Sequence, residues 1–316
     1  MPVLQATRAM RAGVVVAPRY ARAVHVEPPT PGPGEVLLRV EGCGVCGSDV
    51  PVWEGRPWFE YPREPGAPGH EAWGRVEALG DAVTGIELGQ RVTGLTYHSF
   101  AELDVAAAGA LVALPEELDG EPFPGEPLGC AFNVFRRSGI ARGQTVGVVG
   151  IGFLGALIVK LAAAAGARVL AVSRRASSLA LARRCGAELA LPLDAAIDDE
   201  ACDVVVEAAG VQETLDLAGR LTRSGGRLVI AGYHQDGPRV VDLRLWNWRA
   251  LEIVNAHDRD PAAYVAGIRA AVEAVTAGAI DPKPLYTHTF SLDRLDEAIE
   301  LARRRPDGFV KALVAP

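Results

Sequence analysis

The sequence predicts an α/β protein with two domains, one mostly β and the other built on a doubly wound parallel sheet. Three observations support this expectation. The chain has 316 residues, and about 100–200 residues per domain make two domains the expected number. The first 125 residues are rich in Gly and Pro and contain short β-like runs. From about Gly143 onward, apolar strands alternate with amphipathic helices, which is typical of parallel α/β sheets.

The expected strands of the first part are short and are separated by turn residues. They are Glu35–Glu41, Ala72–Leu79, Arg91–Leu95 and Phe100–Val105. The turns between the runs contain Pro28–Pro29, Pro31–Gly34 and Gly66–Gly69. Because Gly and Pro in such clusters interrupt regular structure, the pattern predicts a compact, mostly β domain.

The second part reads as repeated strand–helix units. The expected strands are Thr145–Val149, Arg168–Val172, Asp203–Glu207, Arg227–Ile230 and Leu251–Asn255. The expected helices are Phe153–Ala165, Ser177–Arg184, Gln212–Leu221 and Pro261–Ala277. The tail reads as strand Tyr286–Phe290, helix Leu292–Arg303 and strand Gly308–Val314. Units of this length predict helices on both faces of one parallel sheet.

Composition and charge exclude several classes of protein. Hydrophobic residues make up 49% of the chain and charged residues 22%, which excludes a disordered protein. The net charge of −7 argues against a nucleic-acid partner, because phosphate contacts need a basic face. The apolar stretch Val146–Ala167 is long enough for a membrane span, but four glycines in its first half favour a strand, a turn and a helix. We expect no membrane partner.

The chain shows no sign of secretion. The first 16 residues lack the apolar core of a signal peptide. Five cysteines at irregular spacing do not form a disulfide framework. We therefore expect a cytoplasmic protein.

A glycine motif predicts a dinucleotide site. The residues are Gly150, Ile151, Gly152, Phe153, Leu154 and Gly155, a GxGxxG pattern between an apolar strand and a helix. The first glycine allows a tight turn, the second allows backbone amides to approach a pyrophosphate, and the third allows the helix to pack close to the strand. A structural glycine turn is the alternative interpretation.

The residues after the next strand predict which cofactor is preferred. Ser173 stands where NAD sites carry an acidic residue, and Arg174 and Arg175 follow it. Because arginine forks suit a doubly charged phosphate, we expect NADP(H) to be preferred over NAD(H). The alternative is that both arginines are solvated at a helix start.

Four residues in the N-terminal part are candidate metal ligands: Cys46, His70, Glu71 and Glu126. Thiolate, imidazole and carboxylate together are a mixture of ligands that suits Zn²⁺. With an open position for water, the site would be catalytic. Cys130 is an alternative to Glu126, and Cys43 with Cys46 leaves open a zinc knuckle or a redox disulfide.

These motifs together resemble the zinc-dependent medium-chain alcohol dehydrogenases. The resemblance rests on Gly44–Asp49, Gly69–Glu71, Glu126–Leu128, Gly150–Gly155 and Glu207–Gly210, and it covers nearly the whole chain. It implies a GroES-like, mostly β catalytic domain over residues 1–127, completed by 280–316. It implies a Rossmann domain over 128–279, and a cleft that holds substrate, nicotinamide and zinc.

The resemblance also implies roles for individual residues. Cys46 and His70 would bind one catalytic zinc, with Glu126 as the third ligand, as in the polyol and sugar dehydrogenase branch. Glu71 would bind the metal directly or exchange with water. Asp49 would orient the His70 ring, and Ser48 would accept the proton of the substrate hydroxyl. Ala208 and Gly210 fall in the cofactor-binding part of the pattern.

The chain departs from the larger family members at two places. No cysteine lies between Gly85 and Pro115, so the lobe of four cysteines that holds a structural zinc is missing. Pro51 stands where a relay histidine is often found, so the proton would leave through ribose hydroxyls, water or another base. Family resemblance implies a homodimer or homotetramer joined near Leu251–Asn255.

The expected activity is hydride transfer between NADP(H) and a small secondary alcohol or ketone, namely a polyol, sugar or cyclitol. One alternative is a zinc-free quinone or enoyl reductase of the same superfamily, which would lack the Cys46, His70 and Glu126 set. Another is a non-catalytic NADPH-binding module, which would bind cofactor without hydride transfer.

Overall fold

The computed structural model describes residues 9–234 and 236–316 and divides the chain into two compact units. One unit contains the described residues up to Pro127, together with Val272–Thr276 and Tyr286–Pro316. The other contains Leu128–Ala271 and Ala277–Leu285. Within the described ranges, no helix combines the length and apolarity needed to cross a bilayer.

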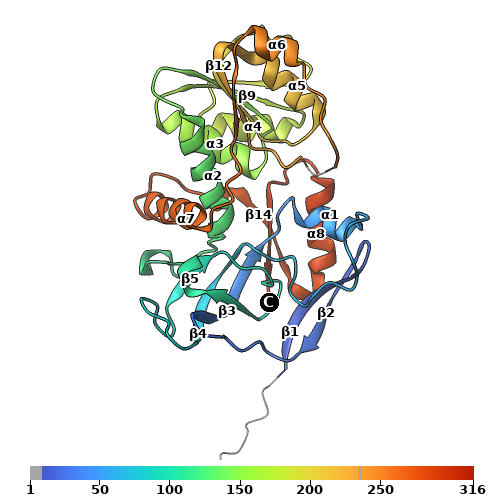
Figure 1. Cartoon of the computed structure of the whole chain (residues 1–316), viewed down its shortest axis with the longest axis vertical. Helices are drawn as coiled ribbons and strands as arrows, with labels where there is room; N and C mark the ends of the chain where they lie inside the picture. Colours follow the sequence, from blue (N-terminus) through green and yellow to red (C-terminus); the bar gives the residue numbers. More distant parts are fainter. Residues whose placement is uncertain (1–8, 235) are drawn as a thin grey trace, which may run out of the picture. The chain divides into compact units, whose positions relative to one another are not determined.

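The first unit is built on a seven-stranded sheet. Its strands are β3 (Glu35–Gly44), β4 (Ala72–Leu79), β5 (Arg91–Gly94), β6 (Leu103–Ala107), β7 (Leu111–Ala113), β14 (Tyr286–Ser291) and β15 (Lys311–Ala315). The order is β14-β15-β3-β4-β5-β7, with β6 also paired to β3. All pairings are antiparallel except that of β14 with β15. The C-terminal strand β15 is hydrogen-bonded to β3, which comes from the first part of the chain (Figure 1). This adjacency brings residues from both ends of the chain to one edge of the site described below.

A hairpin and two helices complete this unit. The hairpin strands are β1 (Met10–Ala17) and β2 (Tyr20–Val26), and the helices are α1 (Asp49–Glu54) and α8 (Leu295–Arg304). Helix α8 buries one face through residues spaced three or four apart: Leu295, Ala298, Ile299 and Ala302. Asp296 at its start accepts hydrogen bonds from the Ala21 amide (2.7 Å) and the Trp53 indole (2.8 Å). One carboxylate therefore fastens β2 and α1 to α8.

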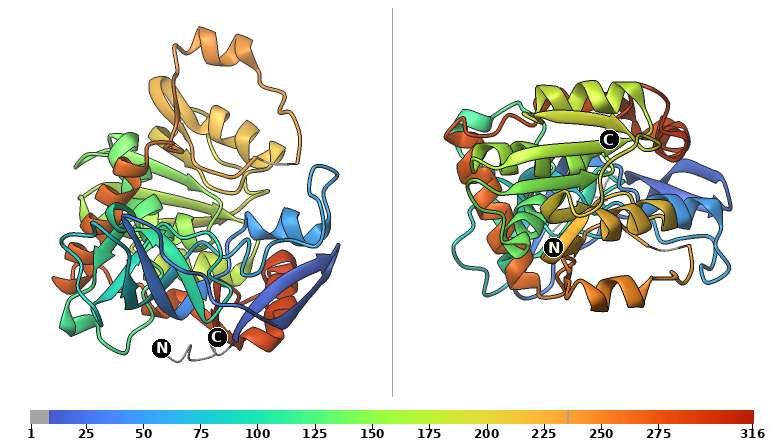
Figure 2. Two further views of the ribbon diagram at one scale, coloured as in Figure 1. Left: turned by 60° about the horizontal axis from the view of Figure 1, so that its bottom comes forward. Right: turned by 90° about the horizontal axis from the view of Figure 1, so that it is seen from above.

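The second unit is a six-stranded parallel sheet. Its strands are β8 (Thr145–Val149), β9 (Arg168–Ser173), β10 (Leu189–Pro192), β11 (Cys202–Glu207), β12 (Thr222–Ile230) and β13 (Glu252–Asn255). The strand order is β10-β9-β8-β11-β12-β13. From β8 the chain first adds strands on one side, through β9 to β10, and then on the other side, from β11 to β13, as expected for a doubly wound sheet. Figure 2 shows these strands side by side with helices on both faces. The helices of this unit are α3 (Phe153–Ala164), α4 (Ala176–Arg184), α5 (Gln212–Leu221), α6 (Leu243–Trp248) and α7 (Pro261–Thr276), of which the last part, Val272–Thr276, is assigned to the first unit. Helix α2 (Gly125–Ser138) starts in the first unit and continues into the second.

The predicted fold class is confirmed, and most expected elements are present. The central strands carry buried apolar residues on both faces, as Val146, Val148 and Val149 do in β8. The sequence analysis did not predict β1, β2, β7, β10, α1, α2 or α6. The expected strands Phe100–Val105 and Gly308–Val314 instead form at Leu103–Ala107 and Lys311–Ala315. The expected helix Leu292–Arg303 begins with a 3-10 turn, and its α-helical part is α8.

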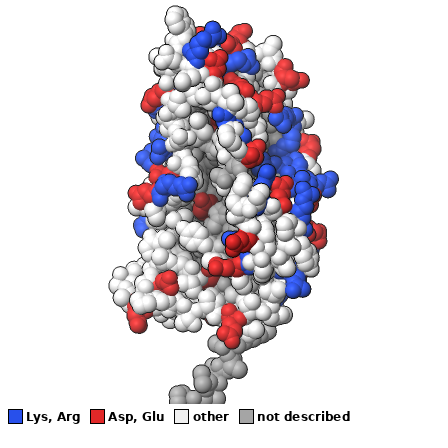
Figure 3. All heavy atoms as spheres, turned by 45° about the vertical axis from the view of Figure 1, so that its right-hand side comes forward, with Lys and Arg blue, Asp and Glu red and all other residues white. Residues whose placement is uncertain are grey.

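The surface charges are mixed. On the face in Figure 3, Lys and Arg are interspersed with Asp and Glu, and large areas carry neither.

Candidate active site

Three predicted metal ligands lie together at one end of the seven-stranded sheet. Cys46 follows the end of β3, and His70 and Glu71 immediately precede β4. One ligand atom from each of the three residues lies within 4.8 Å of the other two. Because β3 and β4 are paired so that Cys43 faces Ala72, the residues just beyond these positions are held close to each other. The sheet register therefore assembles a thiol, an imidazole and a carboxylate from two segments of chain.

Asp49 orders the Cys46 loop and the imidazole. Its Oδ2 accepts a 2.8 Å hydrogen bond from the Cys46 amide, and its Oδ1 lies 3.4 Å from Nδ1 of His70. Nδ1 of His70 also donates a 2.8 Å hydrogen bond to the carbonyl of Pro68, so in the neutral form of the imidazole Nε2 carries the lone pair. This arrangement agrees with the orienting role expected for Asp49.

The same contacts shift the pKa values of both groups. Burial alone would lower the pKa of His70, but the charge of Asp49 and hydrogen bonds to Asp49 and Cys46 hold it well above its ordinary value. Burial raises the pKa of the Asp49 carboxyl, although His70 opposes this effect. An imidazole next to a thiol and a buried carboxylate is a place where a divalent cation can replace protons.

Glu71 forms a buried ion pair that the sequence analysis did not predict. Its carboxylate is fully buried, and Nζ of Lys311 lies 2.6 Å from Oε1 and 2.5 Å from Oε2. Lys311 is only 5% exposed. The two residues are 240 positions apart in the chain, so no local sequence signal connects them.

The remaining candidates in this unit lie around the three residues. Glu126 is half-buried in the first turn of α2 and is not a member of the group defined by the 4.8 Å distance. Ser48 is the N-cap residue of α1, but its hydroxyl makes no capping hydrogen bond. Cys43 and Cys46 are both free thiols. Burial raises the pKa of the Cys43 thiol well above its ordinary value, which suits a packing residue.

The glycine motif has the geometry that a dinucleotide-binding turn requires. Gly150 has a φ of +101°, and a Cβ there would lie 2.7 Å from Cβ of Ala209. A Cβ at Gly155 would lie 2.0 Å from the carbonyl oxygen of Gly150, so only glycine lets α3 begin this close to β8. A Cβ at Gly152 would meet no atom within 4 Å, so its backbone faces open space. Phe153 and Leu154 form the first turn of α3.

A buried carboxylate holds the loop next to this turn. Glu207, at the end of β11, is fully buried, and its Oε1 accepts hydrogen bonds from the amides of Ala209 (2.9 Å) and Gly210 (2.8 Å) and from the hydroxyl of Thr214 (2.7 Å). Its Oε2 accepts a 3.0 Å hydrogen bond from Nε2 of His234. Glu207 thereby fixes the loop that contains Ala208 and Gly210. The sequence analysis used Glu207 only as part of a motif and did not predict this role.

The cofactor-selecting residues lie at the end of β9. Ser173 is its last residue and is buried, whereas Arg174 is exposed and Arg175 precedes α4 as its N-cap residue. The Arg174 guanidinium lies 2.5 Å from the carboxylate of Glu213 on α5. Glu213 is a further residue that the sequence analysis did not single out.

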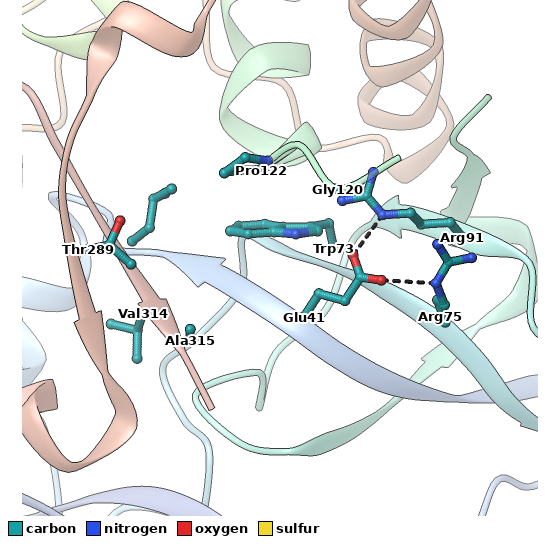
Figure 4. A pocket seen from close by; sticks show the side chains of 10 residues that line it. Glu41, Trp73, Arg75, Arg91, Gly120, Pro122, Thr289, Val314 and Ala315 are labelled. Carbon is teal, nitrogen blue, oxygen red and sulfur yellow. Dashed lines mark hydrogen bonds and ion pairs between the residues drawn. The ribbon is translucent and has the colours of Figure 1, made fainter. Parts of the chain in front are cut away.

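A cavity of about 380 Å³ in the first unit is lined by other residues. Figure 4 shows Glu41 between Arg75 and Arg91, with Trp73 nearby. Glu41 lies 2.6 Å from Arg91 and 3.1 Å from Arg75, and Arg75 also lies 3.1 Å from Asp119, so two carboxylates balance the two guanidinium groups. None of its lining residues belongs to the cluster of Cys46, His70 and Glu71. We therefore assign the candidate active site to the cluster of Cys46, His70 and Glu71 and not to this cavity.

Comparison with known proteins agrees with this arrangement. Residues 32–114 match the alcohol dehydrogenase GroES-like domain, and residues 154–257 match the zinc-binding dehydrogenase family. Sorbitol dehydrogenase of Gallus gallus is 30% identical over 320 residues, covering 87% of this chain and 88% of the relative.

Two solved structures share the fold over nearly the full chain. A zinc-binding dehydrogenase of Sinorhizobium meliloti 1021, solved bound to NADP, has a TM-score of 0.83 and 30% identity, covering 98% of this chain and 99% of the other. A thermostable alcohol dehydrogenase from Pyrobaculum aerophilum has a TM-score of 0.85 and 28% identity, covering 98% and 100%.

The chain belongs to the zinc-dependent medium-chain alcohol dehydrogenase family. Within that family it is of the polyol-dehydrogenase type, and it is an oxidoreductase that acts on small-molecule alcohols.

Proposed function

We propose that this protein is a zinc-dependent dehydrogenase that uses NADP(H) to interconvert a secondary alcohol and a ketone of a polyol, sugar or cyclitol. The observation that carries the proposal is the grouping of Cys46, His70 and Glu71 within 4.8 Å. Thiolate, imidazole and carboxylate are the three ligand types that zinc takes in proteins. The donor set therefore fits zinc.

The chain's own residues have separate roles in this proposal. Cys46 and His70 hold the metal, and the Asp49 carboxylate fixes both through the Cys46 amide and the imidazole. Glu71 and Glu126 are the two carboxylates that can complete the ligand set, and Glu71 is the one that belongs to the 4.8 Å group. When bound, the zinc would supply a Lewis acid for the substrate hydroxyl, and the nicotinamide would supply the hydride donor or acceptor.

Ser48 is the proposed proton acceptor. Its hydroxyl is two residues from Cys46 and is not used to cap α1, so it is available to accept a hydrogen bond from a substrate hydroxyl. Beyond Ser48, the presence of Pro51 excludes an imidazole relay at that position. The proton would pass to water or to a ribose hydroxyl of the cofactor.

The glycine turn and the loop at 208–210 are the proposed cofactor site. Gly150, Gly152 and Gly155 let the start of α3 approach a pyrophosphate. Ser173, Arg174 and Arg175 replace the acidic residue of an NAD site, and the NADP found in the Sinorhizobium relative agrees with this preference. The Glu126-Pro127-Leu128 motif and the resemblance to sorbitol dehydrogenase support a polyol-like substrate.

The proposal is tested by metal analysis together with a substrate screen. Purified protein is assayed for zinc content, and then for NADPH and NADH consumption with ketoses, inososes and simple aldehydes. We expect bound zinc and faster turnover with NADPH on a ketose or inosose. Turnover of quinones by a protein without zinc would instead support a zinc-free reductase. Cofactor binding without turnover of any substrate would support a binding module.

We also propose that the protein forms a homodimer or homotetramer through β13. This strand is at an edge of the parallel sheet, and the exposed apolar side chains next to it include Ile253 (39% exposed) and Trp248 (88%). An edge strand with exposed apolar side chains favours pairing with a second copy.

A further inference from the structure

Three neighbouring strands bring a lysine, a glycine and a glutamate close together, with Gly44 paired to Leu313, two residues from Lys311 on β15. Lys311 starts β15, Gly44 ends β3, and Glu71 directly precedes β4, and these strands are adjacent in the order β15-β3-β4. The Gly44 amide donates a 3.1 Å hydrogen bond to the carbonyl of Glu71, so the two residues face each other across the strands. The lysine therefore has to reach over the glycine to meet the carboxylate.

Gly44 is the residue that makes this contact possible. A Cβ at Gly44 would lie 1.9 Å from Oε2 of Glu71 and 3.0 Å from Cε of Lys311. No larger residue fits without moving the ion pair. The side chains of Glu71 and Lys311 thus occupy the space that a side chain at position 44 would need.

This ion pair and a bound metal compete for the same carboxylate. Glu71 is a member of the cluster with Cys46 and His70, yet Nζ of Lys311 lies 2.6 Å and 2.5 Å from its two oxygens. A carboxylate that accepts a hydrogen bond from an ammonium has less electron density to donate to a metal cation. The positive charge of Lys311 also repels a dication placed a few ångströms away.

We propose that Lys311 is a positioning residue that restrains Glu71 and makes it a weak ligand, so that Cys46 and His70 bind the metal most firmly. The inference rests on the proposed zinc site. In this inference, Lys311 keeps the coordination position next to Glu71 open to exchange with water or substrate. Lys311 does so by holding the carboxylate, without touching the substrate.

The test measures metal affinity instead of turnover. Zinc dissociation constants are obtained by competition with a chromophoric chelator for the wild type, Lys311→Met, Glu71→Gln and the double variant. Methionine keeps the stem of the lysine and removes its charge. We expect Lys311→Met to bind zinc at least ten-fold more tightly than the wild type. We expect Glu71→Gln alone to change affinity less than about three-fold. In the Lys311→Met background, the same Glu71→Gln change should weaken binding at least ten-fold, because Glu71 is then a full ligand.

Lys160, one of the three lysines of the chain, provides a matched control. Lys160→Met removes the same charge from α3, where Nζ bonds the carbonyl of Asp281, and it should leave zinc affinity unchanged. Lys311→Arg keeps the charge and should remain close to the wild type. Visible spectra of the Co²⁺-loaded proteins provide a second readout: the Lys311→Met spectrum should differ from the wild type, and the Lys311→Arg spectrum should not.

The outcomes separate this inference from the proposed function. If the wild type binds no zinc, the proposed function fails. If the wild type binds zinc and is active, but Lys311→Met leaves zinc affinity unchanged or weakens it, only the role of Lys311 is overturned. If Lys311→Met does not fold, the comparison of wild type with Glu71→Gln decides: a loss of ten-fold or more shows that Glu71 is already a firm ligand and contradicts the inference.

Discussion

The guanidinium of Arg174 and the carboxylate of Glu213 form an ion pair of 2.5 Å between the end of β9 and the start of α5. Both side chains are more than 60% exposed. Arg174 is a proposed contact for the 2′-phosphate of NADP, so Glu213 is an anion that competes with this phosphate for the same arginine.

We predict that Glu213→Gln increases NADPH affinity. Removing the carboxylate frees Arg174 and removes its repulsion of the phosphate. Because exposed ion pairs are worth about 0.2–1 kcal/mol, the dissociation constant should fall by about two- to five-fold, with NADH unaffected. Fluorescence titration with both cofactors measures this change.

The control for this prediction is Glu297→Gln, which breaks a similar exposed pair with Arg294 on α8. It should leave the affinities for NADPH and NADH unchanged.

A second variant tests the cofactor preference itself: Ser173→Asp should shift the preference toward NADH. If Ser173→Asp leaves the ratio of the two affinities unmoved, the assignment of NADP(H) is wrong.

We predict that Glu207→Gln weakens cofactor binding and stability together. Nδ1 of His234 accepts a hydrogen bond from Arg239, so its Nε2 carries a proton and donates to Glu207. A glutamine whose oxygen keeps the bonds to Ala209 and Gly210 would turn its amide group toward this N–H, and two donors would face each other. An unsatisfied buried donor costs about 1–3 kcal/mol.

The measurements for Glu207→Gln are the urea midpoint and the NADPH dissociation constant. The urea midpoint should fall and the NADPH dissociation constant should rise. Glu252→Gln, an exposed change on β13, should leave both quantities unchanged. An unaltered NADPH affinity in a destabilised Glu207→Gln protein would show that Glu207 supports the fold but not the cofactor loop.

The sequence was sufficient for the fold class, because this depends on local patterns. It also singled out Cys46, His70 and Glu71, which the structure brings together, and their binding of a metal stays a prediction. Alternating apolar strands and amphipathic helices specify the parallel sheet, and Cys46, His70 and Glu71 lie in short motifs at strand ends. The hairpin β1–β2 was missed because its turn contains Arg19 at a φ of +59°, without the Gly, Asn or Asp that normally marks such a turn.

The role of Lys311 was missed for a different physical reason. Its partner Glu71 is 240 residues away, and only the adjacency of β15, β3 and β4 brings them together. The hydrogen bond between Glu207 and His234 likewise joins the end of β11 to the segment after β12, which meet only in the folded sheet. Whether Glu126 joins the ligand set depends on where α2 begins, which the pattern of residues does not specify.

We predict that the stability of the second unit depends on pH through Asp203. Its carboxylate accepts hydrogen bonds from the Thr145 amide (2.8 Å) and from Arg223 (2.7 Å), and these bonds lower its pKa below the ordinary value. A lowered native pKa means that the stabilisation is complete above the ordinary pKa of aspartate, near 3.9, and is lost as pH falls through the native pKa. Asp203→Asn should therefore cost about 1 kcal/mol at pH 7 and almost nothing below the native pKa.

Thermal unfolding of wild type and Asp203→Asn from pH 7 down to pH 3 tests this dependence. The difference in melting temperature should stay constant down to about pH 4 and shrink below it. A difference that stays constant down to pH 3 would mean that Asp203 acts through packing and not through its charge.

We predict that Ile253→Asp disrupts oligomers. Ile253 is 39% exposed on the edge strand β13, and a carboxylate there would be buried without a partner if a second copy paired with this edge. Light scattering after size exclusion should give a smaller mass for Ile253→Asp than for wild type. The control Leu189→Asp changes an exposed residue on β10, the other edge of the same sheet, and should keep the wild-type mass.

The zinc content of wild type and Cys46→Ala, measured with NADPH binding and turnover, tests the central claim most directly. Cys185→Ala serves as the control, because Cys185 is a buried free thiol in the second unit. We predict zinc and turnover in the wild type and in Cys185→Ala, and neither in Cys46→Ala, which should still bind NADPH. Zinc and undiminished turnover in Cys46→Ala would contradict the account.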